Sequence, residues 1–346
     1  MCFEAIGGCL VQAGAFSADP EKPSSRGRCK ELQDRPYHCG NFRLMIESSR
    51  ADNVPHTCHI PVLVSEVVEN LGLRPGSTVV DGTVGGGGHA SRILAELGPT
   101  GRLFGLDRDA TMLERAAGVL DHPDYSLHQA SYSELEEVLA ADDRSDGLVD
   151  GILLDLGLSS DQLGDESRGF AFGHDGPLDL RFDVSVGRAA WELLATVQEG
   201  ELEECLRLWG EESESAKIAG ALVRRRRESP IRTARDLAEA VESAVGGRRG
   251  RRHPATRVFQ ALRIAVNDEL VHLERALSDA LPKCLASGGR LVVISFHSLE
   301  DRIVKRAFRN TDTWTALTGK PIRPTPREER VNPRSRSARL RAATRV

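Results

Sequence analysis

The sequence contains few aromatic residues and no long apolar run. Phe, Trp and Tyr together make up 5% of the 346 residues, and no stretch approaches the ~20 apolar residues that a membrane-spanning helix needs. The mildly apolar segment 5–16 has no basic region before it, which argues against a secretory signal. With 40% hydrophobic and 28% charged residues, the composition is typical of a soluble globular protein, and we expect a cytoplasmic location without membrane contact.

Cysteine patterns typical of metal sites are also missing. Five of the seven cysteines fall within the first 58 residues, without a CxxC pair or a His partner at zinc spacing. His297, Glu300 and Asp301 offer metal-ligating groups on one predicted helix. However, Ser298 followed by Asp301 three residues later is the pattern of a helix N-cap. We therefore expect no metal.

Lysine is scarce, and positive charge is unevenly spread. Only 6 of the 46 basic residues are lysine, and the net charge is −5. Residues 217–263 hold 13 Lys and Arg against 4 Asp and Glu, and residues 302–346 hold 13 against 3. Two basic segments on an acidic remainder indicate a polyanionic partner. Arginine suits phosphate recognition, although a GC-rich genome produces the same excess.

The periodicity of apolar residues predicts a doubly wound α/β sheet. Residues 1–55 show no pattern, so we expect a disordered or non-structural extension. From residue 56 onward, strands at 78–81, 102–107, 125–129 and 149–156 alternate with helices at 90–97, 110–120 and 133–140. Such alternation at short spacing is typical of a parallel sheet.

The alternation stops after residue 161. Helical patterns follow at 189–197, 199–209, 215–227 and 234–245, then a long helix at 254–285 and a strand at 288–295. An independent helical domain would leave this last strand without a sheet, so we favour an insertion. The predicted parts are an α/β sheet domain in two pieces, 56–161 and 253–310, a helical insertion, 162–252, and a basic C-terminal tail, 311–346.

A glycine-rich loop, 81–89 (DGTVGGGGH), connects the first strand to the next helix. Glycine lets the backbone approach a ligand closely, and a helix N-terminus favours negative charge. Gly85, Gly87 and Ala90 also fit the G-x-G-x-x-A pattern of dinucleotide-binding proteins, so a nicotinamide-dependent oxidoreductase stays open.

Polar side chains follow four predicted strands. Asp81, Asp107, Ser131 with Tyr132, and Asp155 each lie at or just after a strand end. In a doubly wound sheet these ends line one crevice. Asp107 for ribose hydroxyls, Tyr132 against a base and Asp155 nearby make a plausible nucleoside site.

Eleven motifs together resemble the ribosomal RNA small subunit methyltransferase H (MraW) family, in order and over about residues 56–341. They are residues 59–63, 85–89, 105–109, 151–160, 168–170, 176–179, 210–212, 253–257, 259–264, 295–302 and 332–337. The resemblance implies a Rossmann-like class I S-adenosylmethionine methyltransferase with an inserted all-helical domain. It also implies methylation of the exocyclic N4 of one cytidine in the decoding region of 16S rRNA within the small ribosomal subunit.

The family's S-adenosylmethionine contacts can be carried over position by position. They fall on Gly87, Gly88, His89, Asp107, Tyr132, Asp155 and Gln162. Tyr132 stands where the family more often has Phe, Leu180 and Phe182 replace methionines, and Gly164 replaces an acidic residue. These exchanges affect local packing.

Candidate catalytic residues follow from the chemistry of the acceptor. Cytosine N4 is a poor nucleophile because its lone pair is delocalised into the ring, and an acceptor at its N–H would localise the pair and take the proton. Asp155 is nearest by motif position, with Ser159 and Ser160 beside it. Asp179 is a second candidate, equally interpretable as a turn carboxylate, so the catalytic base stays open.

RNA contacts are expected from two places. Arg257, Gln260, Arg263 and Asn267 form a polar face on an otherwise apolar helix, which is either solvated or in contact with substrate. Arg248, Arg249, Arg251 and Arg252 form a dense cluster, as does 224–227; a disordered loop and a solvated helix face are the alternatives. A non-catalytic RNA-binding module is the remaining rival function, and the sequence leaves monomer and homodimer open.

Overall fold

The structure, a computed structural model, describes residues 60–247 and 253–346. The predicted extension, 1–55, and the arginines at 248–252 lie outside this part. The described chain contains one seven-stranded sheet with the order β3-β2-β1-β4-β5-β7-β6. The first five strands are parallel, and β7 is antiparallel to both neighbours. The strands are β1 Thr78–Asp81, β2 Arg102–Asp107, β3 Tyr125–Gln129, β4 Val149–Asp155, β5 Leu285–Ser295, β6 Trp314–Ala316 and β7 Arg339–Arg345.

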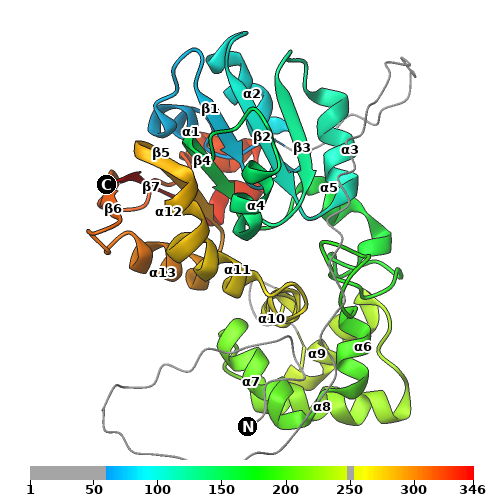
Figure 1. The fold of residues 1–346 in the computed structure, drawn as a ribbon. Helices are drawn as coiled ribbons and strands as arrows, with labels where there is room; N and C mark the ends of the chain where they lie inside the picture. The colour runs from blue at the N-terminus through cyan, green and yellow to red at the C-terminus, as the bar shows by residue number, and fades with distance from the viewer. Residues whose placement is uncertain (1–59, 248–252) are drawn as a thin grey trace, which may run out of the picture. The chain divides into compact units, whose positions relative to one another are not determined.

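Helices cover both faces of the sheet because strand residues alternate between two buried clusters. Val80, Phe104 and Ile152 pack on one face, while Val79, Leu103 and Leu153 pack on the other. The first half alternates as predicted (Figure 1). Its helices are α1 Val64–Leu71, α2 Gly88–Leu97, α3 Ala110–Val119, the 3-10 turn η1 Tyr132–Glu134 and α4 Leu135–Ala140.

The helices that directly follow β4 have a hydrophobic core of their own. They are α5 Ser160–Gly164, η2 Glu166–Arg168, α6 Ala190–Thr196, α7 Glu199–Trp209, α8 Ser215–Glu228 and α9 Ala234–Val245. This core also takes Val258, Phe259 and Leu262 from α10, Thr256–Asn267, and Figure 1 shows α7–α9 gathered around α10. The helical core therefore extends past residue 252, the boundary expected from sequence.

The prediction of a single long helix at 254–285 is wrong, because the helix is interrupted after α10. Asp268 has φ 50°, a left-handed conformation that Asp tolerates better than most residues. The chain continues as α11 Glu269–Arg275, a π-helical turn η3 Ala276–Ala280 and α12 Leu281–Cys284. Apolar spacing continues across the break, so the sequence pattern did not reveal it.

The segment predicted as a basic tail is part of the sheet. Leu340, Ala342 and Ala343 of β7 are fully buried, and Arg341 pairs with Asp301 at 2.7 Å. Between β6 and β7 lie α14 Pro326–Val331 and the 3-10 turn η4 Pro333–Ser337. Among the described helices, none combines the length and the apolar character needed to cross a membrane.

The N-cap of the helix after β5 lies one residue earlier than predicted. In α13, Ser298–Ala307, the N-cap is His297, and the capping box is completed by Glu300 rather than by Ser298 and Asp301. Asp301 instead binds arginines of β7.

Candidate active site

A pocket opens at the carboxyl ends of the parallel strands. The strand order reverses between β1 and β4, the position where open α/β sheets bind ligands. Six of the seven predicted cofactor residues line this pocket: Gly88, His89, Asp107, Tyr132, Asp155 and Gln162. Further lining residues come from distant segments, namely Phe182, Glu269, His272, Phe296, Glu300, Asn332 and Arg334.

The glycine loop is shaped by two left-handed residues. Gly85 has φ 50° and Gly87 has φ 85°, conformations that favour glycine. Gly87, the predicted contact that does not line the pocket, is the N-cap of α2. A Cβ there would lie 3.3 Å from the Cα of Ala116, so this glycine permits close packing of α2 against α3.

Asp107 binds the glycine loop from the end of β2. Its Oδ2 accepts the N–H of Gly85 and its Oδ1 accepts the N–H of Asp109, each at 2.9 Å. Burial raises the pKa of Asp107 to about 6, although the two N–H donors oppose this shift. The carboxylate is therefore mostly ionised at pH 7 and presents an anionic acceptor to the pocket.

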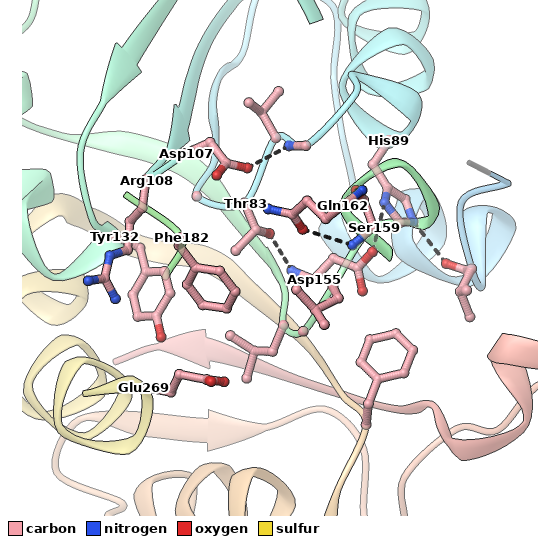
Figure 2. A pocket seen from close by; sticks show the side chains of 18 of the residues that line it. Thr83, His89, Asp107, Arg108, Tyr132, Asp155, Ser159, Gln162, Phe182 and Glu269 are labelled. Atoms are coloured by element: carbon pink, nitrogen blue, oxygen red, sulfur yellow. Dashed lines mark hydrogen bonds and ion pairs between the residues drawn. The ribbon is translucent and has the colours of Figure 1, made fainter. Parts of the chain in front are cut away.

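Asp155 and His89 face each other at the centre of the pocket (Figure 2). His89 Nε2 donates to the carbonyl of Val62 at 2.8 Å, and its Nδ1 lies 3.5 Å from Asp155 Oδ2. Burial lowers the pKa of His89, so the ring is neutral near pH 7 with its Nδ1 lone pair toward Asp155. Burial, with a contribution from Glu300, raises the pKa of Asp155 to about 8. Oδ1 of Asp155 is buried and has no hydrogen-bond partner among the described residues.

Gln162 reaches the pocket but also fixes its wall. Its side chain completes a capping box with Ser159 at the start of α5, and its Nε2 donates to Asp109 Oδ2 at 2.9 Å. Arg168 Nη1 binds the same oxygen at 2.9 Å. The loop after β4 is thereby tied to the end of β2.

Phe182 lies on the segment 169–189, which connects η2 to α6 and which we call the strap. Its side chain enters the pocket close to Tyr132 and Arg108 (Figure 2). The guanidinium of Arg108 lies 5.8 Å from the Phe182 ring, and its Nη1 donates to the carbonyl of Asn267 at 2.6 Å. Burial raises the pKa of Tyr132, so the phenol stays neutral. Sequence reasoning identified Phe182 only as a departure from the family pattern. Nothing in the sequence indicated that Leu180, two residues before Phe182, has a left-handed backbone conformation with φ 64°.

A cluster of Glu269, His297 and Glu300 borders the pocket; sequence reasoning singled out His297 and Glu300 but missed Glu269. Glu269 and Glu300 are buried, and His297 lies near both, so their ligand atoms are within 4.8 Å of one another. Arg263 binds both oxygens of Glu269, at 2.8 and 3.0 Å, and Glu300 contacts His297 at 3.0 Å. The cluster is therefore an internal ion-pair network that joins α10, α11 and α13. Only the break at Asp268 brings Glu269 to this position.

The predicted polar face of α10 is mostly turned inward. Asn267 is 2% exposed, and the Arg263 side chain, 14% exposed, is paired with Glu269. Gln260 donates to the carbonyl of Trp209 at 2.8 Å. Arg257 alone of the four is exposed. The second catalytic candidate, Asp179, does not line the pocket, and both of its carboxylate oxygens are bound by Arg181 at 2.8 Å.

Comparison with known proteins agrees with this geometry. Residues 56–346 match the model of the MraW methylase family. Three relatives are each named ribosomal RNA small subunit methyltransferase H. The protein of Nitrosomonas europaea is 45% identical over 83% of this chain and 97% of its own length. That of Geotalea uraniireducens is 46% identical over 83% and 98%, and that of Methylococcus capsulatus is 46% identical over 81% and 98%.

The rival functions left open by the sequence can now be decided. The glycine spacing alone permitted a nicotinamide oxidoreductase, and the basic segments alone permitted a non-catalytic RNA-binding module. The family match spans the whole described chain, including the pocket residues and the insertion. The chain belongs to the MraW methylase family and is an S-adenosylmethionine-dependent methyltransferase.

Proposed function

We propose that the protein methylates the exocyclic N4 of a specific cytidine in the decoding region of 16S rRNA, within the small ribosomal subunit in the cytoplasm. The names of its relatives support a small-subunit rRNA target. The observation that carries the proposal is Asp155, whose buried Oδ1 lacks a partner among the described residues and borders the pocket. A buried oxygen normally accepts a hydrogen bond, and the N–H of an acceptor amine can supply the missing donor.

The pocket residues fit S-adenosylmethionine, which when bound supplies a methyl group already activated on a sulfonium. The ionised carboxylate of Asp107 retains lone pairs for ribose hydroxyls. The ring of Tyr132 offers an apolar face for adenine, and the N-terminus of α2 at Gly88 and His89 suits the carboxylate of the amino-acid end. The cofactor would therefore extend from β3 to the glycine loop.

Asp155 has the position and the chemistry to act on the acceptor amine. Its Oδ1 would accept the N4–H, which would make the nitrogen lone pair more available, and the carboxylate would take the proton that N4 loses when it is methylated. His89 Nδ1, 3.5 Å from Oδ2, can share that proton. A bound positive charge near Asp155 would favour the ionised carboxylate that this role needs.

Asp179 is the weaker candidate base. Arg181 occupies its carboxylate, and its position outside the pocket lining would leave it without access to the acceptor. Among the predicted RNA contacts, exposed Arg257 stays a proposal, as do Arg224 and Arg227, which are the exposed members of the arginine run on α8. Arg225 and Arg226 of the same run bind backbone carbonyls instead.

The test is methyl transfer to small ribosomal subunits purified from a strain that lacks this methylation. We expect one labelled methyl group per subunit, mapped by mass spectrometry to N4 of one cytidine. Labelling of a different atom or base, or of no RNA, would overturn the proposal. The Asp155→Asn variant serves as the catalytic control.

A further inference from the structure

Five arginines lie close together in the chain between β6 and β7, and all are exposed: Arg323, Arg327, Arg330, Arg334 and Arg336. In the part of the chain that the structure describes, none of these five has a carboxylate within ion-pair distance. Four other C-terminal arginines, Arg302, Arg306, Arg339 and Arg341, pair with carboxylates. Arg302 pairs with Glu211 at 2.9 Å, and Arg341 pairs with Asp301 at 2.7 Å. The segment 321–337, which we call the arginine rim, thus carries uncompensated positive charge.

The arginine rim is held in place by its own polar side chains. Glu328 Oε1 accepts the N–H of Leu63 at 2.8 Å, and Asn332 Nδ2 donates to the carbonyl of Ile60 at 2.9 Å. Ser335 is fully buried and its Oγ donates to the carbonyl of Asn332 at 2.8 Å. Because the backbone is already ordered, binding a ligand here carries a smaller entropic cost than ordering a free tail.

The rim is also adjacent to the site of chemistry. Asn332 and Arg334 line the active-site pocket together with Asp155 and His89. Arg327 and Arg330 are three residues apart on α14, so their side chains project from neighbouring positions on one side of that helix. The uncompensated charges therefore extend from the pocket over the adjoining surface.

We propose that the arginine rim binds the backbone phosphates of the RNA segment that carries the methyl-acceptor nucleotide, with Arg334 closest to that nucleotide. The inference rests on the proposed function. A base can reach a buried carboxylate only after leaving its stack, and its flanking phosphates then stay at the pocket mouth. Arginine binds phosphate through paired N–H donors, and such contacts fix the register of the strand without reading its sequence.

The experiment compares two double variants that remove the same number of charges. Arg327→Ser with Arg330→Ser removes two rim charges. The control, Arg74→Ser with Arg144→Ser, removes two exposed arginines that precede β1 and β4, at the opposite edge of the sheet. The probe is the unmethylated small ribosomal subunit, and the dissociation constant of each full-length protein is measured across a salt series. Calorimetry with S-adenosylmethionine, expected to give equal affinity for all three proteins, confirms that the variants are folded.

The rim variant should bind the subunit less tightly. The logarithm of its association constant should fall less steeply with the logarithm of salt concentration. The slope should be shallower by about 1.4–1.8, because each phosphate that is no longer bound reduces it by roughly 0.7–0.9. The control should keep the slope of the unmodified protein. Equal slopes for all three proteins would overturn the rim proposal while leaving methyl transfer by the unmodified protein untouched. Absence of N4 methylation by the unmodified protein would instead reject the proposed function.

Discussion

The backbone N–H of Phe182 donates to Oδ1 of Asn267 at 2.7 Å, across 85 residues of chain. The amide of Asn267 also donates to the carbonyls of Leu180 and Arg263, at 2.7 and 2.9 Å. One buried side chain thus fastens the strap that carries Phe182 to the break between α10 and α11. The aromatic wall of the pocket depends on this connection.

Asn267→Ala should therefore loosen both the fold and the pocket. The substitution leaves the buried carbonyl of Leu180 and the half-buried N–H of Phe182 without partners, at a cost of about 1–3 kcal/mol in the free energy of unfolding. We expect a lower melting temperature and weaker S-adenosylmethionine binding by calorimetry. The control is Asn310→Ala, whose side chain is exposed and makes only local hydrogen bonds. Equal behaviour of the two variants would contradict a structural role for Asn267.

The parallel half of the sheet could be predicted from sequence because local signals coincide there. The buried runs of β1, β2 and β4 are short, apolar and followed at once by Asp81, Asp107 and Asp155. Parallel strands bring their carboxyl ends to one edge, so three predicted strand ends suffice to locate the pocket. Six of the seven residues carried over from the motifs line this pocket.

Long-range partners determine the parts that the sequence did not reveal. The polar face of α10 was interpreted as either solvated or in contact with substrate, because Asn267 and Arg263 find their partners at Phe182 and Glu269, on segments of no recognisable pattern. Strand β7 looked like a basic tail because Arg339 and Arg341 are neutralised by Asp301 only in the folded chain. In the sequence alone, a strand that alternates apolar residues with arginine looks the same as a basic linker, because the carboxylate that neutralises the arginines lies on another segment.

Asp107→Ala should weaken cofactor binding. Loss of charged hydrogen bonds to ribose costs about 1.5–3 kcal/mol, which corresponds to roughly 10- to 150-fold in dissociation constant. Because Asp107 also binds the N–H groups of Gly85 and Asp109, the variant Asp107→Asn, which keeps one acceptor oxygen, should lose less. Titration calorimetry with S-adenosylmethionine measures both. Unchanged affinity in the alanine variant would remove Asp107 from the cofactor site.

The contribution of Asp81 and Asp155 to the stability of the cofactor-free protein should fall as pH rises from about 4 to 8. Burial raises the pKa values of Asp81 and Asp155 to about 7 and about 8, from an ordinary value of 3.8. The folded state therefore holds protons that the unfolded state has released. The stabilisation that comes from these protons is complete below pH 4 and is lost as pH passes the raised pKa values. Asp155→Asn, which cannot ionise, should gain melting temperature relative to the unmodified protein more at pH 8.5 than at pH 5. Parallel melting curves at the two pH values would show that Asp155 titrates normally.

Asp155→Asn should reduce turnover far more than it reduces affinity for the small subunit. The amide preserves size but cannot accept a proton, and removal of a general base typically costs about 10²–10⁴-fold in rate. In the unmodified protein, turnover should rise with pH as the carboxyl group ionises, and the variant should lose that dependence. Asp150→Asn is the matched control, because Asp150 lies on the same strand but is exposed at its far end, where it accepts the N–H of Thr78 at 2.8 Å. The measurements are single-turnover methyl transfer from pH 6 to 9 and subunit binding for the three proteins. Equal losses of rate and affinity in Asp155→Asn would mean that Asp155 only holds a ligand, and the proton acceptor would then have to be sought elsewhere in the pocket.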